Sequence, residues 1–473
     1  MPERKQIFLP RIFLFLIIFF CALLSPVGAS ADSPTVITDD IVTDTVWTSS
    51  SSPYLVTNSI SVTTDVTLTI APGVVVKFLD SRLNIFGSLI AEGTEAEPIS
   101  FTSFYDEEVG GDTDDETICY ENIDEEGNVI EEICETFDLG EPLSGDWGGV
   151  YFKNSSGSIL KHTSFRYAYN TIYIKTSTVD FENLKIQDGV AAIEIFRDSV
   201  VSLLGVDITN IERGVIDIYD GSLVSMRETR IHDVFGDAIN VYEQSEVFLE
   251  DVSIEDVPDA GIVVFDQSLV EFDGLTISDT SENAVAVFYD SSFSGRELDV
   301  DSRLVNFSDT IVVFNGSDIY LKDSKITNCS TGGCIAVYDD TDYLANPSTA
   351  NIEETVFDTG FSSGVVTFGE SDVNVTISRS SFKDFSGHAV TNYSDFSIMA
   401  ENNFWGDESG PYSEELNPAG LGEAILGNVS FDPWCANIDC KTRYPVIIVP
   451  GLLGTEISKL TADGPEKLWL DLA

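Results

Sequence analysis

Four consecutive segments of 23 residues decide the fold of this chain: IEIFRDSVVSLLGVDITNIERGV (193–215), IDIYDGSLVSMRETRIHDVFGDA (216–238), INVYEQSEVFLEDVSIEDVPDAG (239–261) and IVVFDQSLVEFDGLTISDTSENA (262–284). Written below one another, they align four columns of similar residues. The columns are Ile193, Ile216, Ile239, Ile262 and Val285; Phe196, Tyr219, Tyr242, Phe265 and Phe288; Ile208, Ile231, Ile254 and Ile277; and Asn210, Asp233, Asp256 and Asp279. A fixed period of this size is the sequence signature of a solenoid.

Each unit contains three short stretches in which apolar and polar residues alternate. In the second unit we expect strands over 214–219, 223–226 and 229–231, separated by turns near Asp220 and Asp233. A period of two, with Gly, Asp, Asn and Ser at the breaks, indicates strands and argues against helices. Three strands and three turns per repeat predict an all-β fold, a parallel β-helix whose coils lie about 4.8 Å apart.

The same pattern extends in both directions with looser spacing, from Ile172 and Ile174 to the pair Val390 and Tyr393. We therefore predict roughly a dozen coils and a rod about 60 Å long. The expected organisation is a signal peptide over 1–31, a linker over 32–53, the β-helix over 54–405 with an insertion over 105–145, a cap over 406–440, and the start of another domain over 441–473.

The N-terminus has the features of a secretory signal. Arg4, Lys5 and Arg11 precede an apolar run over 12–24, and Ala29-Ser30-Ala31 offers small residues for cleavage. The apolar run is short for a membrane span, so an uncleaved anchor is the weaker alternative. We expect a secreted or cell-surface protein.

The charge balance is strongly acidic. Lys and Arg total 24 against 80 Asp and Glu, for a formal net charge of −56 over 473 residues. Such a field repels nucleic acid and anionic membrane surfaces, so we predict no nucleic-acid partner. A solvated acidic surface is a simpler interpretation of this charge than an acidic binding role.

Six cysteines remain once Cys21 is assigned to the signal peptide, and they form three close pairs. An oxidising compartment favours the disulfides Cys119–Cys134, Cys329–Cys334 and Cys435–Cys440. Proximity alone supports this pairing, since six cysteines allow 15 connectivities. Zinc is disfavoured because none of the pairs has CxxC spacing and the chain has only three histidines.

The acidic insertion suggests a metal site. Asp112, Asp114 and Asp115 carry oxygen ligands of the kind that Ca²⁺ prefers, although their spacing lacks the glycine and closing glutamate of an EF-hand. A solvated acidic loop is the alternative. We predict no other cofactor.

Several motifs resemble bacterial secreted right-handed β-helix proteins. LTIAPGVVVKF (68–78) and GDWGGV (145–150) are similar to the opening coils of that group. NNFWGD (402–407) and NVSFDPW (428–434) are similar to its closing motif. The resemblance implies a right-handed parallel β-helix over residues 54–434. It does not settle function, because the group includes carbohydrate-active enzymes, adhesins and other surface modules.

The aromatic column from Phe196 to Tyr393 is the candidate binding site on the rod, and its first five rings, through Phe288, are the candidate ladder. It directly follows an inward strand residue, so alternation places it facing outward or at a bend. Outward rings can stack on sugar rings, whereas rings at a bend stack on each other and stabilise the coils. No pair of catalytic carboxylates stands out among the many acids, so a lyase or glycoside hydrolase is a weaker alternative.

The C-terminal residues differ in character from the repeats. YPVIIVPGLLGTEI (444–457) and LWLDL (468–472) resemble the first strand and oxyanion loop of lecithin:cholesterol acyltransferase-like lipases, an α/β-hydrolase family. The resemblance implies that the N–H of Leu452 supplies half of an oxyanion hole. Neither a Gly-x-Ser-x-Gly elbow nor a histidine follows residue 440, so the chain as given lacks the catalytic residues.

These observations predict a non-catalytic binding, adhesion or presentation module with extracellular glycans as partners. The alternative is an accessory N-terminal region of a secreted lipase or acyltransferase. A lipid substrate is expected only if the hydrolase domain is completed beyond residue 473.

Overall fold

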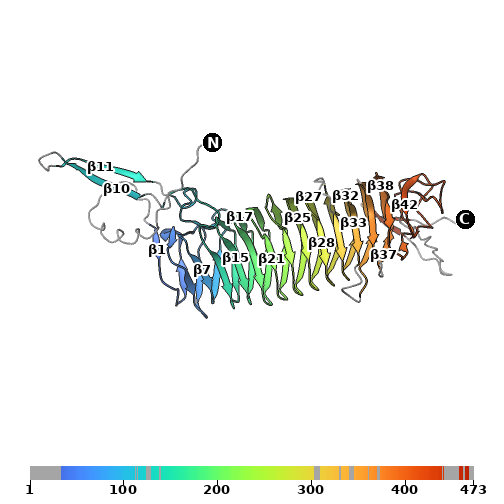
Figure 1. Cartoon of the computed structure of the whole chain (residues 1–473). Helices are drawn as coiled ribbons and strands as arrows, with labels where there is room; N and C mark the ends of the chain where they lie inside the picture. Colours follow the sequence, from blue (N-terminus) through green and yellow to red (C-terminus); the bar gives the residue numbers. More distant parts are fainter. Residues whose placement is uncertain are drawn as a thin grey trace, which may run out of the picture.

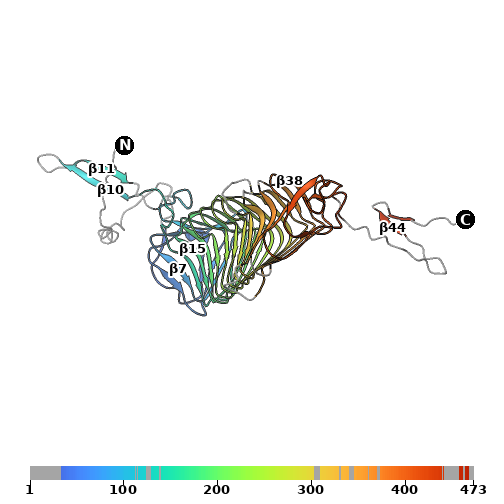
Figure 2. The same cartoon turned by 45° about the vertical axis from the view of Figure 1, so that its right-hand side comes forward.

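The computed structural model describes residues 34–111, 113, 116–123, 129–137, 140–302, 309–329, 332–339, 346–360, 362–369, 373–438, 440, 458–461 and 464–467. They form a parallel β-helix whose coils succeed one another along a rod, from blue to red in Figure 1 and again in the turned view of Figure 2. The predicted all-β solenoid is confirmed.

Sheet B has 15 strands: one from each coil along the rod and two, β42 and β41, from the last turn, which makes slightly more coils than the dozen predicted. Its strands, in spatial order, are β4 (Ile60–Val62), β7 (Arg82–Ile85), β12 (Gly149–Lys153), β15 (Asn170–Lys175), β18 (Ala191–Phe196), β21 (Ile216–Ile218), β24 (Ile239–Val241), β26 (Ile262–Val264), β28 (Val285–Phe288), β30 (Ile311–Phe314), β33 (Gly333–Tyr338), β36 (Ser363–Phe368), β39 (Val390–Asn392), β42 (Gly422–Leu426) and β41 (Pro411–Tyr412).

Sheet A has 26 strands and receives the other strands of each coil. Its strands are β1 (Thr35–Ile37), β2 (Thr45–Trp47), β3 (Tyr54–Val56), β5 (Thr67–Ile70), β6 (Val75–Phe78), β8 (Ser88–Glu92), β9 (Ile99–Ser103), β13 (Ser158–Lys161), β14 (Thr163–Arg166), β16 (Thr178–Glu182), β17 (Lys185–Gly189), β19 (Val200–Leu204), β20 (Asp207–Ile211), β22 (Leu223–Arg227), β23 (Arg230–His232), β25 (Glu246–Val257), β27 (Leu269–Thr280), β29 (Ser292–Asp301), β31 (Asp318–Lys322), β32 (Lys325–Cys329), β34 (Thr349–Glu353), β35 (Val356–Gly360), β37 (Asn374–Ser378), β38 (Ser381–Phe385), β40 (Ile398–Met399) and β43 (Val429–Ser430). A short 3-10 helix covers Ser49–Ser51.

The core is built from the predicted columns. Ile193, Ile216 and Ile239 pair in register on neighbouring strands of sheet B, and all three are fully buried. Burying one such side chain stabilises the fold by about 1.5–3 kcal/mol. Stacking the same residue in every coil therefore turns a short strand into part of a continuous core.

The residues of the polar column lie at turns of the backbone. Asn210, Asp233, Asp256 and Asp279 all have φ between 52° and 54°, in the left-handed region. Asn and Asp tolerate this conformation better than other residues with a β-carbon. The column is thus explained by backbone geometry.

A buried column of serines lines one corner of the coils. The backbone N–H of each serine except the last donates to the hydroxyl of the serine one coil further on, at 3.0–3.3 Å. The column comprises Ser155, Ser177, Ser199, Ser222, Ser245, Ser268, Ser291 and Ser317. These hydroxyls satisfy corner amides that would otherwise be buried without a partner.

The predicted linker over 32–53 is corrected, because the solenoid already begins there. β1 pairs in parallel with β3, and β2 pairs in parallel with β5. These strands have only three residues each, and the central Val36 is 54% exposed. Such short strands with an exposed apolar centre carry little periodic signal.

The insertion contains an antiparallel hairpin, β10 (Glu116–Ile123) and β11 (Val129–Phe137), which projects away from the coils in both views (Figures 1 and 2). Its base is fixed by Lys77, which is fully buried and donates to the carbonyl of Asp106 at 2.7 Å and the hydroxyl of Thr113 at 3.1 Å. Asp106 also receives an ion pair from Arg166 at 3.4 Å. A buried network thus ties the insertion to the rod.

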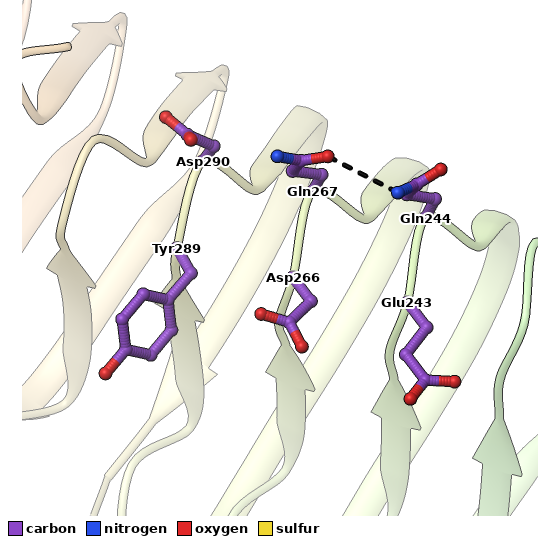
Figure 3. A pocket seen from close by; sticks show the side chains of 6 residues that line it. All are labelled: Glu243, Gln244, Asp266, Gln267, Tyr289 and Asp290. Carbon is purple, nitrogen blue, oxygen red and sulfur yellow. Dashed lines mark hydrogen bonds between the residues drawn. The ribbon is translucent and has the colours of Figure 1, made fainter. Parts of the chain in front are cut away.

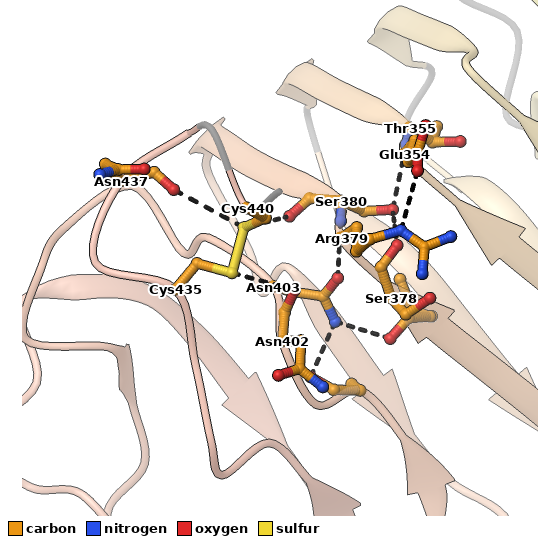
Figure 4. Close-up of a disulfide and its surroundings, with 12 residues drawn as sticks. Glu354, Thr355, Ser378, Arg379, Ser380, Asn402, Asn403, Cys435, Asn437 and Cys440 are labelled. Carbon is orange, nitrogen blue, oxygen red and sulfur yellow. Dashed lines mark hydrogen bonds and ion pairs between the residues drawn. A yellow bond between two sulfur atoms is a disulfide. The ribbon is translucent and has the colours of Figure 1, made fainter. Parts of the chain in front are cut away.

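At the C-terminal end of the rod, residues of the region 406–440 add β42 and β43 to the two sheets. Asn403 is fully buried and accepts the N–H of Ser380 at 2.8 Å (Figure 4). Its amide donates to the carbonyls of Ile377 and Ala400 at 2.8 and 2.7 Å. Trp405 stacks on Phe382, so polar and aromatic contacts together cover the last coils.

Two of the predicted disulfides, Cys329–Cys334 and Cys435–Cys440, are confirmed. Cys119 and Cys134 lie directly opposite each other in the register of β10 and β11, but their side chains are outside the described structure. Within the predicted start of a lipase domain, β44 (Ser458–Thr461) and β45 (Gly464–Lys467) pair antiparallel.

Candidate functional site

The predicted aromatic column lies on the outer face of sheet B. In β18, Ile193 and Ile195 point into the core, while Glu194 and Phe196 point outward. Phe196, Tyr219, Tyr242, Phe265 and Phe288 each follow an inward residue in this way and are half-buried. The structure thus places them outward, at the end of the strand where the chain turns.

The rings also stack on each other. Phe196 and Tyr219 are nearly parallel with centroids 4.9 Å apart, and Tyr219 and Tyr242 follow at 5.1 Å. From Tyr242 through Phe265 to Phe288 the rings are tilted or edge-to-face at 6.0 Å. Neighbouring rings therefore cover much of each other's faces, and the column stabilises the coils while offering a strip of ring edges to solvent.

The ladder extends in both directions beyond the first five rings. Toward the C-terminus it continues, as the sequence predicts, through Phe314, Tyr338, Phe368 and Tyr393. Toward the N-terminus it continues through Tyr173 and Tyr151, at 5.2 and 4.9 Å. In the strand register Tyr173 lies opposite Glu194 and not opposite Phe196. The ladder therefore shifts by two residues along the strand at this coil, and an alignment of the repeats does not find Tyr173 and Tyr151.

A polar row runs beside the ladder, two residues earlier in each strand. Glu194, Asp217 and Asn240 are neighbours in register. The amide of Asn240 donates to Asp217 at 2.9 Å, and the amide of Asn170 donates to Glu194. Burial raises the pKa of both carboxyl groups, and it also raises the pKa of Asp237 nearby.

Asn240 in this row and Asn170 beside it have buried amide oxygens. Asn170 and Asn240 are 8% and 7% exposed, and their side-chain oxygens have no partner among the described residues. A buried acceptor without a hydrogen bond is costly, so a donor group that reached either oxygen would stabilise this surface. The sequence analysis did not single out this row, although the outward positions of the repeat contain it.

Shallow pockets line the opposite side of the ladder. One is formed by Glu243, Gln244, Asp266, Gln267, Tyr289 and Asp290, at the turns of three successive coils (Figure 3). The Gln244 amide donates to the Gln267 side-chain oxygen at 3.5 Å. All six residues have positive φ, which brings their side chains out at the corner. The ladder therefore lies between two polar borders.

Other predicted positions are not tested by this arrangement. Asp112, Asp114, Asp115 and Leu452 lie outside the described residues. Within the described ranges, no group of three or more His, Cys, Asp or Glu could hold a metal ion. The same part of the chain has no helix of the length and apolarity needed to cross a membrane.

Comparison with solved structures finds distant matches at 12% identity. A variant of the catalytic domain of a GH87 α-1,3-glucanase, with bound tetrasaccharides, has a TM-score of 0.40, and the match covers 76% of this chain and 63% of the glucanase. A variant of the periplasmic alginate epimerase AlgG has a TM-score of 0.37 over 84% and 85% of the two chains. An alginate lyase from Paenibacillus sp. has a TM-score of 0.26 over 79% and 99%.

No curated protein sequence matches the chain. The family model described as the right handed beta helix region matches residues 127–247 and 237–405, which together span more than half of the chain. This match agrees with the parallel register of both sheets and with the columns of buried isoleucine. The chain therefore belongs to the right-handed β-helix family.

Proposed function

We propose that the outer face of sheet B binds carbohydrate. The observation that carries this proposal is the strip of aromatic ring edges beside Asn170 and Asn240, whose buried amide oxygens have no partner within the described structure. Sugars combine apolar C–H groups with hydroxyl donors, and they need both kinds of surface. The ring spacing of 4.9–6.0 Å between Phe196 and Phe288 is comparable with the length of one pyranose unit.

The repeat itself supplies a variant that tests the proposal. Asn240 lies opposite Val263 in the next coil, so Asn240→Val copies a residue that the same strand position already accepts. The variant should fold normally and bind glycans about tenfold more weakly, because one hydrogen-bonding pair to a sugar hydroxyl is lost. Tyr320→Ala, an exposed ring of sheet A, is the matched control.

The measurement is titration calorimetry against a panel of oligosaccharides found by glycan-array screening. Weaker binding by Asn240→Val with unchanged binding by Tyr320→Ala supports the proposal. An array on which the wild type binds nothing, or equal affinity for wild type and Asn240→Val, contradicts it.

A second candidate function is polysaccharide hydrolysis at Glu194 and Asp217. These carboxyl groups face outward from neighbouring strands, and burial raises the pKa of each, which favours a protonated general acid. Strands lie about 4.8 Å apart, close to the separation of about 5–5.5 Å in retaining glycosidases. Product release from a polysaccharide panel that Glu194→Gln and Asp217→Asn abolish would support hydrolysis, and a blank panel would exclude it.

An extracellular setting is part of the proposal. The disulfides Cys329–Cys334 and Cys435–Cys440 support it, because such bonds persist in oxidising compartments. N-terminal sequencing of exported protein should begin at Asp32. Recovery of the protein only from the cytoplasm would contradict this setting.

A further inference from the structure

Three cations gather at the N-terminal end of the aromatic ladder, in a chain with 80 acidic and 24 basic residues. Arg82, Lys153 and Lys175 belong to β7, β12 and β15 of sheet B, and Lys153 lies directly opposite Lys175 in register. The group is called the basic cluster below. Its members come from successive coils, although the insertion separates Arg82 from the two lysines in the sequence.

Two members of the basic cluster, Arg82 and Lys153, lie against the first two rings of the ladder. The Arg82 guanidinium carbon lies 4.9 Å from the ring centroid of Tyr151. The Lys153 ammonium nitrogen lies 5.1 Å from the same centroid and 5.8 Å from that of Tyr173. Cation–π attraction to the rings holds Arg82 and Lys153 near the surface, and Arg82 also forms a side-chain hydrogen bond with Tyr151.

No carboxylate lies within ion-pair distance of these three cations in the described part of the chain. By contrast, Lys161 and Arg379 each contact two carboxylates. Burial, together with the charges of Arg82 and Lys175, lowers the pKa of Lys153. Holding like charges together without a counter-charge costs free energy, and a bound anion would remove that cost.

The basic cluster is aligned with the proposed binding strip. Lys175 lies opposite Phe196, the first ring of the predicted column, and Tyr173 lies opposite Glu194. A glycan that follows the ladder toward the N-terminus therefore passes from a row rich in carboxylates to a cationic end. A uniformly anionic polymer would be repelled by Glu194 and Asp217 along its whole length. A single anionic group at the N-terminal end of the ladder would lie beside three cations and one carboxyl group, that of Glu194.

We propose that Arg82, Lys153 and Lys175 bind one carboxylate or sulfate group on an otherwise neutral glycan. This inference rests on the proposed carbohydrate-binding function of sheet B and names its ligand class: a glycan with a single acidic sugar at the end that lies over Tyr151 and Tyr173. Charge-assisted hydrogen bonds from Lys and Arg are the expected contacts.

The test is titration calorimetry of the full chain with four probes. They are a neutral tetrasaccharide, the same tetrasaccharide with one terminal uronate, the same with one terminal sulfate, and inorganic sulfate alone. The variants are the double variant Lys153→Gln with Lys175→Gln, and the control Lys185→Gln, which removes an exposed lysine from sheet A.

The wild type should bind one of the charged tetrasaccharides at least about tenfold more tightly than the neutral one. The double variant should lose this preference while binding the neutral probe unchanged, and Lys185→Gln should keep it. Comparison of the uronate, sulfate and free-sulfate probes identifies which anion the cluster selects.

Failure of this inference can be distinguished from failure of the proposed function. Equal affinity of the wild type for neutral and charged tetrasaccharides, or a preference that survives in the double variant, overturns the inference and leaves the proposed function standing. Absence of binding to all three tetrasaccharides overturns the proposed function, and this inference with it.

Discussion

Replacing Ser222 with alanine tests how much the serine column stabilises the rod. Ser222 is 1% exposed. Its hydroxyl accepts the N–H of Ser199 at 3.3 Å and donates to the carbonyl of Tyr219 at 2.7 Å. Alanine removes only the hydroxyl oxygen, so apolar packing hardly changes while two buried backbone groups each lose a hydrogen bond.

The expected loss follows from these contacts. A net hydrogen bond contributes about 0.5–1.5 kcal/mol, and a buried group left unpaired costs about 1–3 kcal/mol. We therefore expect Ser222→Ala to lower the free energy of unfolding by about 2 kcal/mol. Ser225→Ala, a half-buried serine in the next strand, is the control and should change it by less than about 0.5 kcal/mol.

Urea denaturation gives the change in the free energy of unfolding, provided that the m-value stays constant. Amide hydrogen exchange gives a local measurement, because the N–H of Ser199 should exchange faster only in Ser222→Ala. If the two variants are equally stable and the exchange of Ser199 is unchanged, the serine column does not stabilise the coils and the reasoning is wrong.

Three further predictions concern the insertion, a disulfide and pH. Lys77→Met should destabilise the fold by about 3 kcal/mol, because the buried oxygens around Lys77 lose their donor; urea denaturation showing wild-type stability would contradict this. Replacing Cys329 and Cys334 with serine should lower the free energy of unfolding by about 2 kcal/mol, since the bond closes a short loop. Reduction of the wild type should lower its thermal midpoint at least as much as the double substitution does, because reduction also opens Cys435–Cys440; no change in the midpoint of either sample would contradict this prediction. Burial raises the folded-state pKa of Asp217 above its ordinary 3.8, so the folded state binds more protons and the wild type loses stability as the pH rises through that pKa. Asp217→Asn should lose less stability than the wild type between about pH 4 and pH 7 in denaturation experiments, and identical pH dependence would refute this explanation.

The fold was predictable because its cause is periodic. Ile193 and Ile216 occupy the same position in successive repeats, and the same spacing in sequence brings them together in space. The left-handed turns at Asn210 and Asp233 follow from residue type in the same way. The first strands were missed since β1 has only three residues with an exposed centre.

The candidate site was only partly predictable. The central rings appear in the sequence as a column, but Tyr151 and Tyr173 lie two residues out of phase with it. The polar row changes chemistry from coil to coil, from Asp217 to Asn240 and then Val263, so a search for repeated residues passes over it. Its relevance depends on burial and on unpaired oxygens, which a single sequence does not display.

The corners of the rod absorb differences in length without disturbing the columns. Corner serines that contact each other are 22 residues apart at Ser155 and Ser177, 23 apart at Ser222 and Ser245, and 26 apart at Ser291 and Ser317. From Phe196 to Phe314, each coil still contributes one inward residue, one ring and one serine at matching positions. Duplication of a single repeat in the gene would thus lengthen the rod by a complete coil, so the protein can evolve in whole units whose new surface is immediately aligned with the old.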